Sequence, residues 1–290
     1  MKTMRLYFPV QAGLFAKNNL SGKMFNDYSY GGYLLYATYP KLQVFIDGRA
    51  DVYLCCEMKE YLLLAANKHL RDDEYQKFLN GFFNKYQISF AIVSPQKHNI
   101  FRRITKLLSK DPDWTLIFWD DDAQIFVKKD GKNDGIIKSL ETKYATPYLR
   151  EPFPKDKIEK SLFEYERMDA VAKSARTSNA IGYIFLLQNE FQKAKDRFND
   201  AINRDPTFES PFMNLAELAF KDREIKKAIG LYQKAQSLAP DRGLIYIRWG
   251  QFILEDTHDK NLARKIWEMG IKNTVDDDAR KKLAELLQTL

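Results

Sequence analysis

The chain has 290 residues, a length that predicts two domains rather than one. A content of 45% hydrophobic and 14% aromatic residues excludes wholesale disorder, because such a chain can bury substantial cores. The formal net charge of +7 is concentrated in the first half, where residues 1–150 hold 22 Lys and Arg against 16 Asp and Glu. No basic cluster or nucleic-acid-binding motif accompanies this excess, so we expect no nucleic-acid partner.

Apolar runs in the chain are short. None approaches the roughly 18 residues of a transmembrane helix, and the N-terminal residues lack the apolar core and cleavage site of a signal peptide. We therefore expect no membrane span within this chain, and the sequence leaves its localisation open. Cys55 and Cys56 are adjacent, a spacing that favours two thiols over a disulfide.

The first half alternates strand and helix patterns. Pro9 opens the first helical pattern, and the β-branched and aromatic run 42–47 is typical of a buried strand. Two strand-like runs about an acidic turn predict a hairpin. The expected elements, in chain order, are a helix over 8–19, a strand over 23–26, a helix over 30–39, a strand over 42–47, helices near 57–69 and 72–85, a strand over 88–94, a helix over 99–110 and a hairpin over 114–129.

This alternation predicts an α/β domain over residues 1–130. We expect three layers and a mixed sheet with a parallel core and an antiparallel edge. Glycines and three prolines over 131–156 indicate a linker, and a helix over 157–175 is expected to bridge to the second half.

The stretch 25–53 gathers the polar and glycine residues that a binding site needs. Gly31 and Gly32, at the start of a helix, can leave backbone N–H groups that hold an anion. Arg49 follows the expected buried strand, where open α/β sheets bind ligands, and can clasp a phosphate or carboxylate. In the alternative interpretation Arg49 pairs with Asp51 or Asp27, and the loop is scaffolding. The candidate ligand-binding residues are Asn26, Asp27, Tyr30, Gly31, Gly32, Asp47, Gly48, Arg49 and Asp51.

Catalytic and metal-binding motifs are absent from the sequence. The three histidines, at positions 69, 98 and 258, are too scattered for a metal site. The acid groups 111–113 and 120–122 match the D-x-D pattern by which many nucleotide-sugar glycosyltransferases hold a metal, but both fall in expected turns, where such residues are ordinary. We expect no catalytic residue, no metal and no cofactor. Sugar transfer through Asp120–Asp122 stays open as an alternative that requires nucleotide-sugar binding.

The second half contains a repeat. Residues 191–206 and 225–240 align at a period of 34, and a third unit is one residue longer within "EDTHDKN". Small residues at matched positions let two helices approach closely, large ones fill the space between units, and prolines end each hairpin. The matched packing positions are Gly182, Ala194, Phe198, Pro206, Ala216, Ala228, Tyr232, Pro240, Gly250, Ala263 and Trp267.

This pattern resembles the tetratricopeptide family, whose repeat is a pair of antiparallel helices. The resemblance implies an all-α superhelix within a helical domain over 157–290, with units at 175–208, 209–242 and 243–276 and a capping helix after them. A concave groove in such an array binds a peptide or a partner protein. The alternative is that the repeats pack on the first domain or mediate self-association.

The segment 7–53, with its glycine pair and "VFIDGR" run, resembles the extracytoplasmic region of a family of bacterial multi-pass membrane proteins. Those proteins are related to lipid-phosphosugar-dependent (GT-C type) glycosyltransferases. The resemblance implies an extracytoplasmic location and a glycan or lipid-linked sugar as a further partner. It places the catalytic acids on loops between membrane helices, which we do not find in this sequence.

We therefore hypothesise a non-catalytic binding protein that is accessory to a membrane envelope-glycan or glycosyltransferase-like system. The alternative is a soluble domain of a lipid-phosphosugar-dependent glycosyltransferase, which would contact the lipid-linked sugar or the acceptor through Asp27, Asp47 and Arg49.

Overall fold

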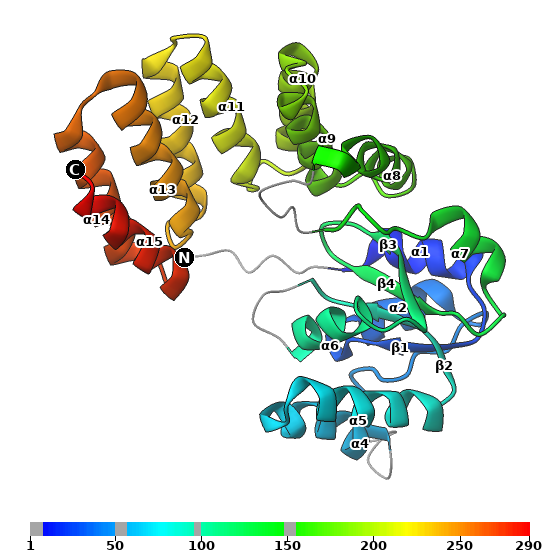
Figure 1. Cartoon of the computed structure of the whole chain (residues 1–290). Coiled ribbons are helices and arrows are strands. Elements are labelled where there is room, and N and C mark those ends of the chain that lie inside the picture. The colour runs from blue at the N-terminus through cyan, green and yellow to red at the C-terminus, as the bar shows by residue number, and fades with distance from the viewer. Residues whose placement is uncertain (1–7, 50–56, 96–99, 148–154) are drawn as a thin grey trace. The chain divides into compact units, whose positions relative to one another are not determined.

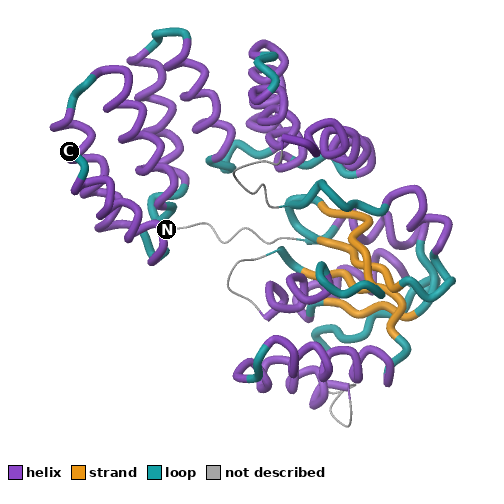
Figure 2. The backbone as a smooth tube through the Cα atoms, in the orientation of Figure 1, coloured by secondary structure: helices purple, strands orange, loops and turns teal. Residues whose placement is uncertain are grey.

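The computed structural model describes residues 8–49, 57–95, 100–147 and 155–290. The chain divides into two compact units, Met1–Lys173 and Ser174–Leu290. Most of the described chain is helical, and four strands form one small mixed sheet in the first unit (Figures 1 and 2). Within the described ranges, no helix combines the length and the apolar character needed to cross a membrane.

The first unit alternates strands and helices, as the hydrophobic patterns predict. Its helices are α1 Val10–Asn19, α2 Gly31–Thr38, α4 Glu57–Ala66, α5 Asp72–Lys85, α6 Ile100–Leu108, α7 Asp134–Leu140 and α8 Ile158–Val171, with 3-10 turns at Tyr28–Tyr30, Asn67–His69 and Lys155–Lys157. Its strands are β1 Lys23–Asn26, β2 Ile88–Val93, β3 Trp114–Trp119 and β4 Gln124–Lys128.

The sheet has the strand order β1-β2-β4-β3. β1 and β2 are parallel, whereas β4 runs antiparallel to both β2 and β3. β3 therefore runs in the same direction as β1 and β2. As a result, the carboxyl ends of these three strands meet at one edge of the sheet, which is where open α/β sheets carry their ligands.

Helices pack on both faces of the sheet. On one face Phe25 of β1 and Phe126 of β4 share a core with residues of α4, α5 and α6. On the other face Phe118 of β3 contacts Phe15 of α1, with ring centroids 4.9 Å apart. The register of β3 shifts between Leu116 and Phe118, and this irregularity turns Phe118 to the opposite face. Figure 1 shows α4 and α5 below the sheet.

The prediction of a buried strand at 42–47 is wrong. The segment is buried at Leu42 and Ile46, as its apolar sequence predicts, but it is an irregular loop. The Asn26 side chain supplies the hydrogen bonds that a neighbouring strand would have made. Its Oδ1 accepts the Phe45 N–H at 2.8 Å, and its Nδ2 donates to the Ile46 carbonyl at 2.8 Å. Backbone groups buried in this way need such partners.

The segment expected to be a linker, 131–156, contains α7, which packs against β3. Asn133, which precedes α7, exchanges hydrogen bonds with the backbone of Ser21 at 3.0 and 3.1 Å. Next along the chain, the Glu164 carboxylate of α8 accepts the N–H groups of residues 143–145. α8 therefore belongs to the first unit, whereas we expected the helical domain to begin at 157.

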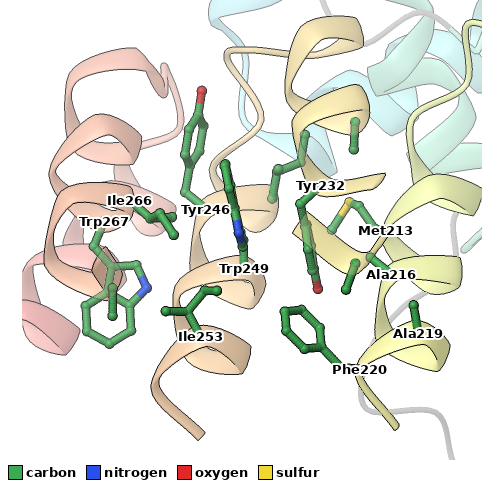
Figure 3. Close-up of a cluster of buried hydrophobic side chains, with 14 of the residues drawn as sticks. Met213, Ala216, Ala219, Phe220, Tyr232, Tyr246, Trp249, Ile253, Ile266 and Trp267 are labelled. Carbon is green, nitrogen blue, oxygen red and sulfur yellow. The ribbon is translucent and has the colours of Figure 1, made fainter. Parts of the chain in front are cut away.

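The second unit consists of three helix pairs and a final helix. Its helices are α9 Ala175–Leu187, α10 Phe191–Arg204, α11 Ser210–Lys221, α12 Ile225–Leu238, α13 Gly243–Phe252, α14 Lys260–Asn273 and α15 Asp277–Gln288. α9 packs on α10, α11 on α12 and α13 on α14. The Asp276 carboxylate caps α15, and Leu283 of α15 joins the buried core that Figure 3 shows between the second and third pairs. The unit is thus a tetratricopeptide-like helical array.

Small residues sit where two helices of a pair come closest. A Cβ atom on Gly182 would lie 2.7 Å from the Phe198 ring, and one on Gly250 would lie 2.1 Å from the Trp267 indole nitrogen. The alanines among the matched positions, together with Phe198, Tyr232 and Trp267, are buried. Pro206 and Pro240 lie in the turns that connect one pair to the next.

The extra residue of the third unit is absorbed in a π-helical turn over Ile253–Thr257. Each helix pair turns at a residue with positive φ, at Asn189, Arg223 and His258. The first two lie 34 positions apart and the last two 35, so the π turn restores the register of the hairpin.

Candidate functional site

The carboxyl edge of the sheet gathers polar side chains from elements far apart in the sequence. Asn26 ends β1 and Asp27 follows it, Ser94 follows β2, and Asp120 follows β3. The 42–47 loop contributes the side chain of Asp47 to this edge. The main chain of the loop is hydrogen-bonded to the Asn26 side chain. All these polar residues are buried.

Asp27 caps the 3-10 turn Tyr28–Tyr30, which runs directly into α2, the helix expected to hold an anion at its glycine pair. Its Oδ1 accepts the Ser29 N–H at 2.9 Å and the Ser29 hydroxyl at 2.8 Å, so the chain supplies its own carboxylate at the start of this turn. Its Oδ2 is buried and has no hydrogen-bond partner. Burial raises the pKa of Asp27, and the hydrogen bonds from Ser29 oppose this rise.

Gly31 and the Asp47 loop are in direct contact. A Cβ atom on Gly31 would lie 2.0 Å from the Ile46 carbonyl oxygen and 2.6 Å from the Asp47 Cα, so only glycine fits here. Gly32 and Gly48, by contrast, border open space. Because Gly31 is packed against backbone, its role in this structure is close approach rather than exposure of N–H groups.

Arg49 pairs with Asp47, an acid that we did not name as its partner. Its guanidinium donates to both carboxylate oxygens, with Nη2 2.6 Å from Oδ2 and Nε 3.0 Å from Oδ1. The Arg49 backbone N–H donates to the same Oδ1 at 2.9 Å. The Asp47 side chain is 2% exposed and that of Arg49 is 58% exposed. The bidentate pair therefore fastens the exposed Arg49 side chain to a buried carboxylate. Asp51 lies outside the described residues.

Tyr30 links the β1 end of the edge to the hairpin turn. Its buried hydroxyl donates to the Asp122 carbonyl and also hydrogen-bonds Ser94. Burial raises the pKa of Tyr30 well above its usual range, and the carboxylates of Asp27, Asp122 and Asp120 add to the rise.

Asp120 is a buried acid of this edge with a strongly raised pKa. Its Oδ1 accepts the N–H groups of Asp122 and Ala123 at 2.8 and 2.7 Å, which is the turn role that the sequence predicts. Burial raises its pKa to about 7. We missed Asp120 and Ser94 as members of the same edge as Asp27. Their positions directly after strand ends were the available signal.

These side chains pair with one another and with the backbone. In the described part of the chain, no group of three or more His, Cys, Asp or Glu side chains is arranged to hold a metal ion. The edge is therefore a hydrogen-bonded network that ties β1, the 42–47 loop and the hairpin turn together.

A second polar network connects the first helices of the three pairs in the second unit. Asn214 of α11 donates to Asn179 of α9 at 2.9 Å, and Arg248 of α13 donates to Asn214 at 3.3 Å. Arg248 also lies 4.0 Å from the Glu217 carboxylate. None of these four residues was among the candidates from the sequence.

No protein-family model matches the chain, and no curated protein matches it. The resemblance to GT-C-type membrane proteins, and with it the bacterial and extracytoplasmic expectations, therefore has no support from these comparisons.

Similarity is found only at the level of solved structures and is partial. The crystal structure of MamA matches with a TM-score of 0.35 and 19% identity over 44% of this chain and 71% of that one. The human IFIT1 dimer with PPP-AAAA matches with a TM-score of 0.40 and 19% identity over 47% of this chain and 35% of that one. The N-terminal domain of stress-induced protein-1 (STI-1) from C. elegans matches with a TM-score of 0.32 and 24% identity over 39% of this chain and 93% of that one. The repeat spacing and the packing of the helix pairs define the second unit as a tetratricopeptide-like array.

Proposed function

We propose that the second unit is a protein-interaction module that docks a partner protein on the first helices of its three pairs. The observation that carries this proposal is the distribution of charge. The first helices α9, α11 and α13 contain four charged residues, whereas the second helices α10, α12 and α14 contain fourteen. Depletion of charge is a property of the centres of protein interfaces.

The side chains of the first helices support this assignment. Several apolar residues of α11 and α13, including Phe212, Leu244 and Ile247, pack against the core but are only partly buried. A partner that covered them would remove further apolar surface from water, which favours association. The polar network of Asn179, Asn214 and Arg248 crosses the same helices and would fix the orientation of a bound chain.

A matched pair of variants tests the proposal. Ile247 on α13 and Ile229 on α12 are both partly buried and pack against the same core. We expect Ile247→Lys to abolish partner binding and Ile229→Lys to retain it, at equal thermal midpoints. The measurements are cross-linking of the full chain in cell extract with mass spectrometry, and sedimentation velocity of the pure protein for self-association.

Two outcomes would overturn the proposal. One is that the wild-type chain captures no specific partner and does not self-associate. The other is that both lysine variants, while folded, retain the captured partner equally. The resemblance-based association with a glycosyltransferase-like system is not part of the proposal, because no structural observation favours it.

A further inference from the structure

A cavity of about 290 Å³ lies between α4 and α5, and none of its lining residues belongs to the polar network at the carboxyl edge of the sheet. Its apolar part is formed by Leu63 of α4 and by Phe78 and Phe82 of α5. Leu63 is 44% exposed, so the cavity presents apolar surface to solvent. This volume is close to the lower end of small-molecule sites, about 300 to 1,000 Å³.

A stripe on α5 forms one wall of the cavity. Lys77, Gly81 and Lys85 also line it, and their spacing of four residues places them on one helix face. A Cβ atom on Gly81 would meet nothing within 4 Å. Glycine is destabilising inside a helix relative to alanine, and here it leaves the middle of the stripe open.

The two lysines differ in their pairing. Lys85 forms an ion pair with Glu60 across the groove, so its charge is compensated. Lys77 is exposed and makes no ion pair within the described residues. The cavity therefore has an apolar floor, a neutralised end and an uncompensated cationic end.

We propose that the α4–α5 cavity binds a small amphipathic carboxylate. Its hydrocarbon body would lie on Leu63, Phe78 and Phe82, and its carboxylate would accept a charge-assisted hydrogen bond from Lys77. An apolar pocket with one convergent polar group is the usual arrangement for orienting such a ligand. This site lies in the first unit and is independent of the partner-binding function proposed for the second.

Octanoate, octanol and octylammonium are the probes, because they share one hydrocarbon chain and differ in charge. Binding to the full chain is measured by titration calorimetry and by chemical-shift changes of the α4 and α5 amides. We expect octanoate to bind about tenfold more tightly than octylammonium, since the charge at Lys77 attracts one and repels the other.

Three variants locate the site. Lys77→Gln should weaken octanoate about fivefold and leave octanol unchanged, because the charge contact is lost while the floor remains. Lys138→Gln, which removes an exposed lysine from α7, should change neither. Gly81→Leu should remove binding of both probes by filling the groove, with an unchanged or higher thermal midpoint.

The proposal is overturned if octanoate fails to bind, or if octylammonium binds equally well. It is also overturned if the folded Gly81→Leu protein binds octanoate like the wild type, because the ligand would then lie elsewhere. If Lys77→Gln and Lys138→Gln weaken octanoate binding equally, the effect is one of net charge, and the proposed contact between the carboxylate and Lys77 is refuted.

Discussion

Replacement of Asp120 by asparagine should remove a pH-dependent loss of stability from the first unit. The Asp120 side chain is buried at the end of β3, with the residue 3% exposed. Burial raises its pKa from the usual 3.8 to about 7, although two backbone N–H groups donate to it. Asparagine keeps an oxygen that accepts both N–H groups, but it carries no charge at any pH.

The sign of the effect follows from the raised pKa. The folded protein holds a proton on Asp120 that the unfolded chain releases above its lower pKa. This group therefore stabilises the fold fully below pH 3.8, and that contribution is lost as the pH rises through about 7. At about 1.36 kcal/mol per pKa unit, the loss amounts to about 4 kcal/mol as an upper limit.

We expect Asp120→Asn to be more stable than the wild type at pH 8 by about 1 to 4 kcal/mol and to lose most of that advantage at pH 5. Amide hydrogen exchange of β3 and β4 at pH 5, 6, 7 and 8, corrected for intrinsic rates, reports the opening free energy of this unit alone. Asp113→Asn, which changes an exposed acid in the turn before β3, is the control and should show no such pH dependence. A difference between Asp120→Asn and wild type that stays constant from pH 5 to 8 would refute the reasoning.

The remaining predictions concern packing and buried hydrogen bonds. Gly250→Ala should lower the free energy of unfolding of the second unit by about 1 to 3 kcal/mol, because the new methyl group overlaps Trp267. Gly230→Ala, whose new methyl group meets no neighbouring atom, should raise the free energy of unfolding by about 0.5 to 1 kcal/mol; urea denaturation followed by tryptophan fluorescence distinguishes the two variants. Asn26→Leu should destabilise the first unit by about 1 to 3 kcal/mol for each backbone group left unpaired in the 42–47 loop, and unchanged exchange protection of Phe45 would contradict this. Glu164→Ala removes the oxygen that accepts the N–H groups of residues 143–145, so proteolysis there should become faster, and unaltered cleavage would argue against the anchor.

Local periodicity determined the second unit and the hairpin. The 34-residue spacing places Gly182 against Phe198 and Gly250 against Trp267, because each repeat packs mainly on itself and its neighbour. The extra residue of the third unit was equally visible in the sequence, although its form as a π turn was not. The β3–β4 hairpin follows from alternation about a short acidic turn.

Only the tertiary structure decided the conformation of the 42–47 loop and which side chains share the carboxyl edge of the sheet. The apolar pattern of 42–47 predicts burial correctly, but whether a buried segment becomes a strand depends on which donors and acceptors lie beside it, and Asn26 lies there instead of a free strand edge. Asp120 joins Asp27 at one edge of the sheet because β1, β2 and β3 run in the same direction. Such pairings depend on where separate segments meet in space, a property that no local pattern encodes.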